Sequence, residues 1–326
     1  MPVHNAGEFV ARAVESILNQ TFRELELIVI DDGSTDDTAN EVSRVADGRV
    51  RVLHQPVPTG DLGRTLNIGL AEARGEYVAR MDGDDLSYPE RFAAQVAALD
   101  ADPGVGLVGT WADVIDEHDR HVMVSRPPVT SERVLLVLHY RSTFHHPAVM
   151  YRRQLAMEVG GYREGKAFAE DYDLWSRLSG VSRLQNLPRV LFAQRVHSSS
   201  ASARFPEGQA AVADAVAADM FARTGVPLPS LEVLTTLRTG QGSLASVKAA
   251  TEVLSSLGQA LRPAVESSTR LRRAVVEELA AFWPAPVADG SMSAWMVSAR
   301  LQPVWTLRRM KHVLQPRLPG RPGRPG

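Results

Sequence analysis

The amino-acid sequence predicts an α/β protein with a doubly wound sheet, followed by a region of α-helices. Strand-like and helix-like segments alternate from the start of the chain to about residue 85, which is the usual pattern of such sheets. Aspartates also follow two strand-like runs directly, at Asp31-Asp32 and at Asp82 to Asp85. Ligands of these sheets bind beyond the carboxyl ends of the strands. We therefore expect both acidic clusters at one binding edge.

Each expected element has a local signal. Apolar residues recur at helical spacing over 6–22, and Asn5 is the candidate N-cap. The almost wholly apolar run 25–30 is typical of a buried parallel strand, and 49–54 alternates as a strand does. The other elements expected in this part are helices at 38–46 and 63–73 and a strand at 77–81.

The first residues are unusual for this fold class. If Pro2 to Asn5 form the loop after a first strand, that strand is missing from the sequence. We therefore expect a truncated first strand. The alternative is a sheet that has no strand at this position.

The character of the chain changes after about Arg204. Four helix-like segments follow, at 209–224, 231–237, 246–257 and 268–282. We expect a first domain over 1–205, a helical region over 206–314 and a disordered Pro/Gly/Arg tail over 315–326. No acidic residue follows Asp289, while arginines alternate with Trp295, Trp305 and aliphatic residues. A solvated terminal helix is the plain interpretation of this segment, and peripheral contact with an anionic membrane is the alternative.

Composition excludes several classes of protein. The net charge of -2 argues against a nucleic-acid binder. With no cysteine there is neither a disulfide nor a thiolate metal site. No run of about eighteen apolar residues predicts a membrane span, and the opening MPVHNAGEF has no pattern of a secretory leader. We expect a cytoplasmic protein, peripheral to the membrane if the basic segment binds lipid.

The stretch MDGDD contains three carboxylates within four positions, at Asp82, Asp84 and Asp85. Oxygen ligands on a short loop suit a hard divalent cation such as Mn²⁺ or Mg²⁺, and such an ion can bridge protein carboxylates to a diphosphate. A calcium-binding EF loop does not fit, because its twelfth position would be Ala93. A solvated acidic loop is the plain alternative.

Three further stretches carry candidate site residues. In VIDDGSTDDT, a carboxylate could accept a hydrogen bond from a nucleotide base, although Asp36 or Asp37 could simply cap the next helix. In FAEDYDLWSRL, capping explains one of the acids at 170, 171 and 173 but not all three. In RVHSSSAS, His197 is either a structural histidine or a third metal ligand.

These motifs, in this order, resemble those of family 2 glycosyltransferases of the GT-A fold. PVHNAGEFVARAVESILNQTFRELELIVIDDGSTDDT resembles the opening of that family, GEYVARMDGDDLSYPERFAAQV its D-x-D segment and AEDYDLWSRL its E-D motif. HHPAVMYRR and VGGYRE resemble its acceptor side. The resemblance covers about residues 1–205. It implies a GT-A-type mixed sheet with a Rossmann-like nucleotide-binding layer, and an inverting enzyme. Because the Gln-x-x-Arg-Trp motif of the processive members is absent, the implied enzyme is non-processive.

The resemblance also implies a role for each site residue. Pro2, Val3 and Asp32 match positions that hold the nucleotide base, with Asp31 beside them. Asp82 matches the position near the ribose and diphosphate, and Asp84 the metal-coordinating one, with His197 as a further ligand. Asp171 matches the catalytic base, with Glu170 beside it. The implied partners are a divalent metal, a nucleoside-diphosphate sugar and a glycan or lipid-linked acceptor, with His145, His146, Arg152 and Arg153 on the acceptor side.

Two other functions remain open from the sequence. A GT-A-like binding module would hold nucleotide without turnover, because of its short N-terminus. A sugar nucleotidyltransferase would share the α/β layer and the metal, but PVHNAGEF is not a glycine-rich, basic phosphate loop. No G-x-G-x-x-G follows a strand, which argues against an NAD-binding domain.

Overall fold

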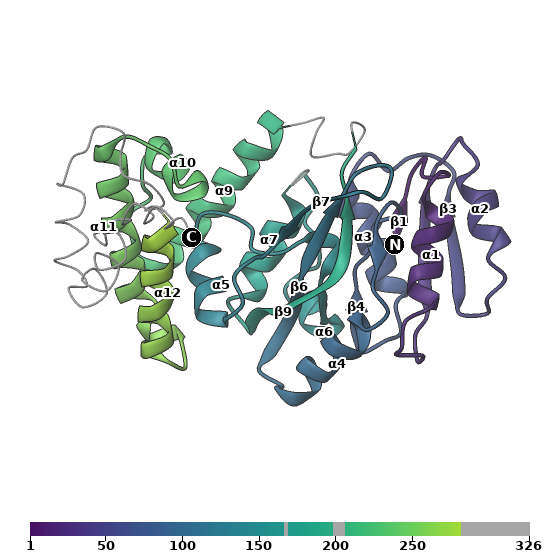
Figure 1. Ribbon diagram of the computed structural model, residues 1–326, viewed down its shortest axis with the longest axis horizontal. Helices are drawn as coiled ribbons and strands as arrows, with labels where there is room; N and C mark the ends of the chain where they lie inside the picture. The colour runs from purple at the N-terminus through teal and green to yellow at the C-terminus, as the bar shows by residue number, and fades with distance from the viewer. Residues whose placement is uncertain (166–168, 198–205, 282–326) are drawn as a thin grey trace, which may run out of the picture. The chain divides into compact units, whose positions relative to one another are not determined.

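The computed structural model describes residues 1–165, 169–197 and 206–281 (Figure 1). The chain divides into two compact units, one of Met1–Leu228 with Leu257–Val275 and one of Pro229–Ser256 with Val276–Gly326. The first unit includes the helix that begins at Pro206, so this division differs from the expected boundary after residue 205. The basic segment after Asp289, with its alternative of membrane contact, lies outside the described residues.

The N-terminal part alternates strands and helices as predicted. Its elements are β1 (Pro2–Val3), α1 (Val10–Leu18), β2 (Leu27–Asp32), α2 (Thr38–Arg44), β3 (Val50–Gln55), α3 (Leu62–Glu72) and β4 (Tyr77–Ala79). β1, β2 and β3 form a parallel three-stranded sheet. The strands and helices expected between residues 25 and 81 are confirmed, with ends shifted by a few residues.

The central part builds a second, mixed sheet. Its strands are β5 (Leu86–Ser87), β6 (Val105–Ile115), β7 (His121–Ser125), β8 (Met150–Arg152) and β9 (Arg183–Arg195). Its helices are α4 (Arg91–Ala101), α5 (Ser131–Val137), η1 (His146–Ala148), α6 (Arg153–Glu158) and α7 (Glu170–Leu178). Hydrogen bonds connect the strands in the order β4-β8-β6-β9-β5, and β7 pairs with β6. β4 therefore belongs to this second sheet and not, as the prediction of one doubly wound layer implied, to the sheet of β2.

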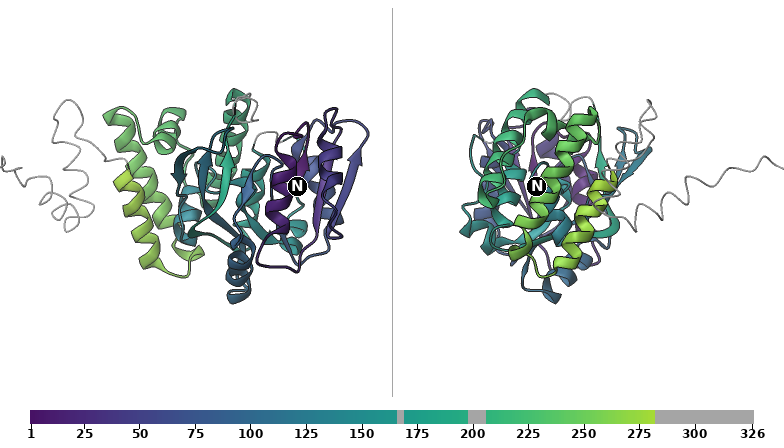
Figure 2. Two further views of the ribbon diagram at one scale, coloured as in Figure 1. Left: turned by 45° about the vertical axis from the view of Figure 1, so that its right-hand side comes forward. Right: turned by 90° about the vertical axis from the view of Figure 1, so that its left-hand side faces the viewer.

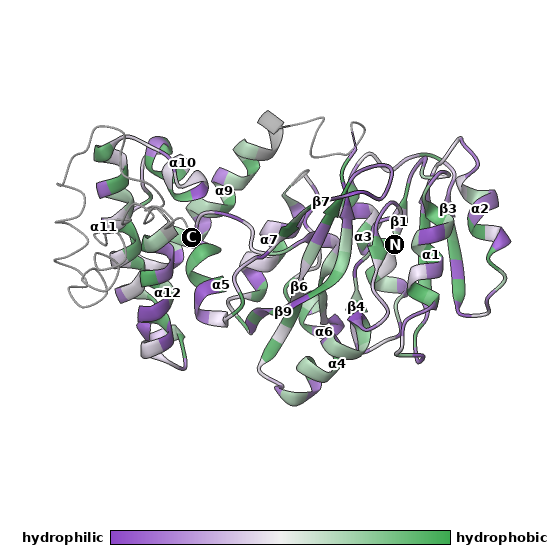
Figure 3. Ribbon diagram, viewed as in Figure 1, coloured by the Kyte–Doolittle hydropathy of each residue, from purple (hydrophilic) through white to green (hydrophobic). Residues whose placement is uncertain are grey.

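The four helices predicted after residue 205 are confirmed. They are α9 (Pro206–Thr224), α10 (Leu231–Thr239), α11 (Leu244–Ala260) and α12 (Ser268–Ala281), with η2 (Arg262–Ala264) before the last. Figure 3 shows hydrophobic and hydrophilic residues alternating along α12, as expected of an amphipathic helix. Within the described part of the chain, no helix is both long and apolar enough to cross a membrane.

Helix α1 covers the three-stranded sheet with one apolar face. Val10, Ala13, Val14 and Ile17 are buried and belong to the same hydrophobic cluster as Leu27 and Val29 of β2. Fully burying a large aliphatic side chain stabilises a fold by about 1.5–3 kcal/mol, so this face holds α1 in place. Figures 1 and 2 show α1 beside α2, and residues of the two helices are in contact.

The predicted N-cap of α1 is wrong. The helix begins at Val10 after Phe9, and Asn5 lies in a left-handed conformation with φ of 50°, which asparagine tolerates better than most residues. Its Oδ1 accepts a hydrogen bond from the main-chain N–H of Thr35 at 2.8 Å. Asn5 therefore joins the loops that follow β1 and β2. The N-cap residue of α2 is Asp37, which makes no side-chain cap bond, while the neighbouring Asp36 accepts from the N–H of Thr38, the first residue of the helix, at 3.0 Å.

Strand β1 is much shorter than its neighbour. Its two residues pair with Ile30 and Asp31 near the carboxyl end of the six-residue strand β2. Residues 27, 28 and 30 of β2 and the whole of β4 line a cavity of about 530 Å³. Pro2 and Val3 are thus strand residues, so the expectation that Pro2 to Asn5 form a loop is wrong for these two residues, and the alternative of a sheet without a strand here is wrong as well.

Candidate active site

The acidic loop lies between β4 and β5. One carboxylate oxygen each from Asp82, Asp84 and Asp85 lies within 4.8 Å of the others. A Cβ atom at Gly83 would lie 2.7 Å from Cγ1 of Val3, so glycine is needed for the loop to approach β1 this closely. Because Val3 pairs with Asp31, the structure brings the two predicted acidic clusters to one place although their strands belong to different sheets.

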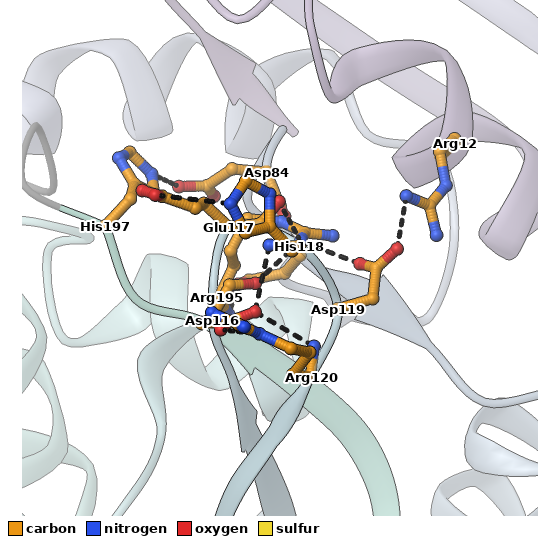
Figure 4. Close-up of polar contacts among 10 residues, drawn as sticks. Arg12, Asp84, Asp116, Glu117, His118, Asp119, Arg120, Arg195 and His197 are labelled. Atoms are coloured by element: carbon orange, nitrogen blue, oxygen red, sulfur yellow. Dashed lines mark hydrogen bonds and ion pairs between the residues drawn. The ribbon is translucent and has the colours of Figure 1, made fainter.

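His197 contacts this loop. It follows β9, and its Nε2 lies 2.9 Å from Oδ2 of Asp84 (Figure 4). The Asp84 and His197 side chains are 29 % and 14 % exposed, so both are within reach of a ligand yet shielded from bulk water. The fold thus brings together two residues separated by 113 positions in the sequence, and the role of His197 as a metal ligand stays a prediction.

The charges of the loop are poorly balanced. Burial raises the pKa of Asp82 against the opposing charge of Arg80, and Asp84 raises it further. Burial, with the charges of Asp84 and Asp82, raises the pKa of Asp85 well above its usual value. A bound cation would relieve this repulsion. Carboxylate oxygens fit Mn²⁺ or Mg²⁺, and an added imidazole nitrogen favours Mn²⁺ over Mg²⁺, which prefers oxygen ligands.

Arg80 is a site residue that the sequence analysis did not identify. It is 4 % exposed and forms an ion pair with Asp82. Hydrogen bonds fix its main chain, because its N–H donates to Val149 at 3.0 Å and its C=O accepts from Arg91 at 2.7 Å. Its charge counteracts the rise in the pKa of both Glu170 and Asp171. The guanidinium therefore links the acidic loop to the E-D motif. An arginine at the end of an apolar strand was the signal for it.

Pro2 and Val3 are buried in β1, and the two aspartates end β2. Burial acts to raise the pKa of Asp31, but hydrogen bonds from Ser34 and His54 outweigh it and leave the pKa below its usual value. Asp32 accepts from the N–H and hydroxyl of Thr59 at 2.8 and 2.9 Å. Both carboxylates are thus held in fixed orientations at the carboxyl end of the strand.

The E-D motif forms the first turn of α7. Glu170, Asp171 and Asp173 all lie in this turn, and the N-cap residue is Ala169, without a side-chain cap. Asp173 is structural, since it accepts two hydrogen bonds from Arg177, at 2.9 and 2.6 Å. The first two acids are not used in this way. The positive end of the helix dipole favours their charged forms.

Glu170 and Asp171 have unusual environments. Burial raises the pKa of Glu170 to about 7 and also raises the pKa of Asp171. Oε1 of Glu170 lies 3.9 Å from Nδ1 of His146, and the buried Oε2 has no hydrogen-bond partner among the described residues. An aspartate with a raised pKa is a better proton acceptor near neutral pH than a fully solvated one.

Of the four residues assigned to the acceptor side, His146 is the one whose ring lies beside Glu170 of the E-D motif. His145 bonds to Gln194 and Ser125, both at 2.8 Å, as a packed loop histidine would. Arg152 donates to the carbonyls of Val105 and Leu99, at 3.0 and 2.7 Å. Arg153 donates to the carbonyl of Leu70 at 3.2 Å. The two arginine side chains therefore support the backbone, whereas His145 is held by two other side chains.

The raised pKa of Glu170 predicts a pH-dependent stability. Between pH 4.5 and about 7 the folded protein keeps a proton that the unfolded chain has lost. The stability from protonated Glu170 is therefore complete below pH 4.5 and is lost as the pH rises through 7. Glutamine cannot ionise, so Glu170→Gln should gain stability over the wild type with rising pH, by on the order of 3 kcal/mol. Urea denaturation at pH 5 and pH 8 measures this difference.

Glu8→Gln, at an exposed glutamate, controls for the loss of one carboxylate. If the unfolding free energies of Glu170→Gln and the wild type differ by the same amount at both pH values, the raised pKa is contradicted.

Comparison with known proteins identifies glycosyltransferases similar to this chain. The sequence model described as "Glycosyl transferase family 2" matches residues 1–160. An uncharacterized glycosyltransferase of Haemophilus influenzae is 30 % identical over 219 residues, which cover 63 % of this chain and 67 % of the relative. The O-antigen biosynthesis glycosyltransferase WbnJ of Escherichia coli is 29 % identical over 204 residues, or 61 % of this chain and 79 % of WbnJ.

Solved structures agree on the fold. S. aureus TarS 1-349 in complex with UDP-GlcNAc has a TM-score of 0.53 at 17 % identity, over 93 % of this chain and 90 % of that one. The mannosyltransferase PcManGT of Pyrobaculum calidifontis, in complex with GDP-Man and Mn²⁺, has a TM-score of 0.50 at 21 % identity, over 95 % and 82 %. The mixed α/β architecture is therefore that of GT-A glycosyltransferases. Together with its relatives and its D-x-D and E-D motifs, this places the chain in glycosyltransferase family 2.

Proposed function

We propose that this glycosyltransferase moves a sugar from a nucleoside diphosphate to an acceptor hydroxyl, with inversion at the anomeric carbon and dependence on a divalent cation. The observation that carries the proposal is the contact of Asp84 with His197 beside Asp82 and Asp85. A carboxylate–imidazole set at the end of a strand is suited to a metal–diphosphate pair, and a solvated acidic loop would not need the histidine.

Asp82, Asp84 and His197 would hold Mn²⁺ or Mg²⁺. When bound, the cation stabilises the negative charge that develops on the departing diphosphate. Arg80, paired with Asp82, keeps that carboxylate oriented. Pro2, Val3, Asp31 and Asp32 line the place proposed for the nucleoside, where a carboxylate can accept a hydrogen bond from a base N–H.

Asp171 is the proposed general base. It takes the proton of the acceptor hydroxyl while the acceptor oxygen forms a bond to the anomeric carbon and the bond from that carbon to the diphosphate breaks. Its raised pKa suits this role. Glu170, with its pKa raised to about 7, keeps a proton for part of the time near neutral pH, which limits repulsion between the two neighbouring acids.

The relatives support the substrate classes. PcManGT is seen with GDP-Man and Mn²⁺, and TarS with UDP-GlcNAc. WbnJ acts in O-antigen biosynthesis. We infer a nucleotide-sugar donor and a glycan or lipid-linked acceptor in polysaccharide synthesis.

Donor hydrolysis tests the proposal without a known acceptor. The full chain is incubated with a panel of nucleotide sugars in the presence of Mn²⁺, Mg²⁺ or EDTA, and released nucleoside diphosphate is measured. We expect one donor to be hydrolysed in a metal-dependent manner. Nucleotide binding without hydrolysis across the panel would instead favour the binding module without turnover.

A further inference from the structure

Arg195, the last residue of β9, is bound to two consecutive residues of the acidic loop. Its main-chain N–H donates to Oδ1 of Asp85 at 2.7 Å. Its Nε donates to the main-chain carbonyl of Asp84, also at 2.7 Å. The side chain is only 1 % exposed, so these bonds are shielded from water. The end of β9 is therefore tied to the backbone that carries Asp84.

The same guanidinium holds the turn between β6 and β7. Nη1 donates to the carbonyl of Asp116 at 3.0 Å and forms an ion pair with Oδ1 of Asp119 at 2.7 Å (Figure 4). The cation also lies 4.6 Å from the ring centre of Phe9, within the range of a cation–π contact. One buried side chain thus joins three separate segments of the chain.

His197 lies two residues after Arg195. Its ring packs 5.7 Å from that of Phe9, tilted by 32°, and its Nε2 reaches Asp84. Arg195 therefore fixes the two backbones from which Asp84 and His197 project. Groups behind a set of metal ligands commonly orient those ligands in this way, and their loss typically weakens metal binding.

We propose that Arg195 is a positioning residue that keeps Asp84 and His197 at the spacing a divalent cation requires, and so sets the affinity of the cation site. This inference rests on the metal site of the proposed function. Arg195 acts through the backbone of Asp84 and not on the reacting atoms. Its positive charge opposes cation binding, and the ion pair with Asp119 offsets that charge. The benefit to the site is therefore geometric.

Lysine separates geometry from charge. Arg195→Lys keeps the positive charge, but a compact ammonium cannot reproduce the planar fork that reaches Asp84, Asp116 and Asp119 together. Arg195→Gln removes the charge as well. If geometry is what matters, both substitutions weaken the cation site. If the charge only repelled the cation, glutamine would strengthen it.

The test is direct titration with Mn²⁺ in the absence of donor, with free Mn²⁺ followed by electron paramagnetic resonance. We expect Arg195→Lys and Arg195→Gln to lower Mn²⁺ affinity by roughly 10- to 100-fold. Turnover of Arg195→Lys should recover at high Mn²⁺. The matched control is Arg12→Gln, because Arg12 pairs with the other oxygen of Asp119 at 2.7 Å and is 52 % exposed. This variant is expected to leave Mn²⁺ affinity unchanged.

Wild-type Mn²⁺ affinity in folded Arg195→Lys would overturn the proposal. If the Arg195 variants do not fold, Asp119→Asn offers a second test, because it removes the charged partner of Arg195 and leaves Arg195 itself in place. A smaller but measurable loss of Mn²⁺ affinity is then expected, and an unchanged affinity would count against the positioning role. A wild-type protein that binds neither Mn²⁺ nor Mg²⁺ contradicts both this role and the metal site. One that binds Mn²⁺ but transfers no sugar contradicts the proposed function alone, and the shift in Arg195→Lys would still support the positioning role.

Discussion

Asp171→Asn is expected to lower the turnover number for sugar transfer by about 10²- to 10⁴-fold, the usual contribution of a positioned base, and to leave donor affinity unchanged. Asparagine has nearly the same shape, so the N–H of Tyr172 that donates to Oδ1 of Asp171 at 2.7 Å keeps its acceptor. What is lost is the ability to take a proton. Transfer assays with the donor found in the hydrolysis panel, together with calorimetric binding of that donor, measure the two quantities separately.

Asp173→Asn is the matched control for this experiment. It makes the same chemical change in the same turn of α7, at a carboxylate that accepts two hydrogen bonds from the buried side chain of Arg177 and a third from Arg163. Weakening such a buried pair destabilises a fold strongly, so this variant should show a lower melting temperature without a matching loss of turnover by the folded protein. If turnover falls equally in both variants, the effect of Asp171→Asn comes from damage to the helix, and the role as a base is wrong.

The sequence predicted the local elements well because their signals are local. The apolar run before Asp31 and the helical spacing of the apolar residues in α1 depend on residues that are neighbours in the chain. The hydrogen-bonded partners of β4 could not be predicted in this way. It pairs antiparallel with β8, about seventy residues later, and nothing in the three residues of β4 specifies that partner.

The residues of the candidate site also differ in whether the sequence alone could identify them. The acids of MDGDD and of the E-D motif stand out in the sequence because like charges crowd together there. Arg80 and Arg195 do not stand out. Arg80 pairs with Asp82 only two positions away, but its effect on the pKa of Glu170 and Asp171 depends on folding. Arg195 likewise acts through residues brought near by folding, such as the Asp84 carbonyl, which lies 111 positions from it. Asn5 shows the opposite kind of error, because a local signal predicted a role that the fold does not use. Its side chain accepts a hydrogen bond from another loop, and α1 begins four residues later than an N-cap at Asn5 would require.

Asp84→Ala is expected to remove the response of donor hydrolysis to Mn²⁺ and to lower the rate by roughly 10²- to 10³-fold, because a cation at a leaving group typically contributes several kcal/mol. In contrast to Asp171→Asn, donor affinity should also fall, since the diphosphate loses the charge that binds it. The substitution leaves His197 without its 2.9 Å partner. Mn²⁺ titration and hydrolysis of the same donor test this expectation.

Glu117→Gln is the matched control for Asp84→Ala. It removes one negative charge from the turn beside the loop (Figure 4), at a side chain that is 54 % exposed. An effect of general electrostatic attraction would lower Mn²⁺ affinity in both variants, although salt screens exposed charges, whereas direct coordination predicts a large loss in Asp84→Ala alone.

The variants Asp84→Ala and Asp171→Asn together decide the roles of the acidic loop and of α7. If Asp84→Ala weakens donor binding and Asp171→Asn does not, the loop holds the leaving group and α7 holds the base. An equal loss of donor binding in both would contradict that division, because a base that acts on the acceptor has no reason to hold the donor.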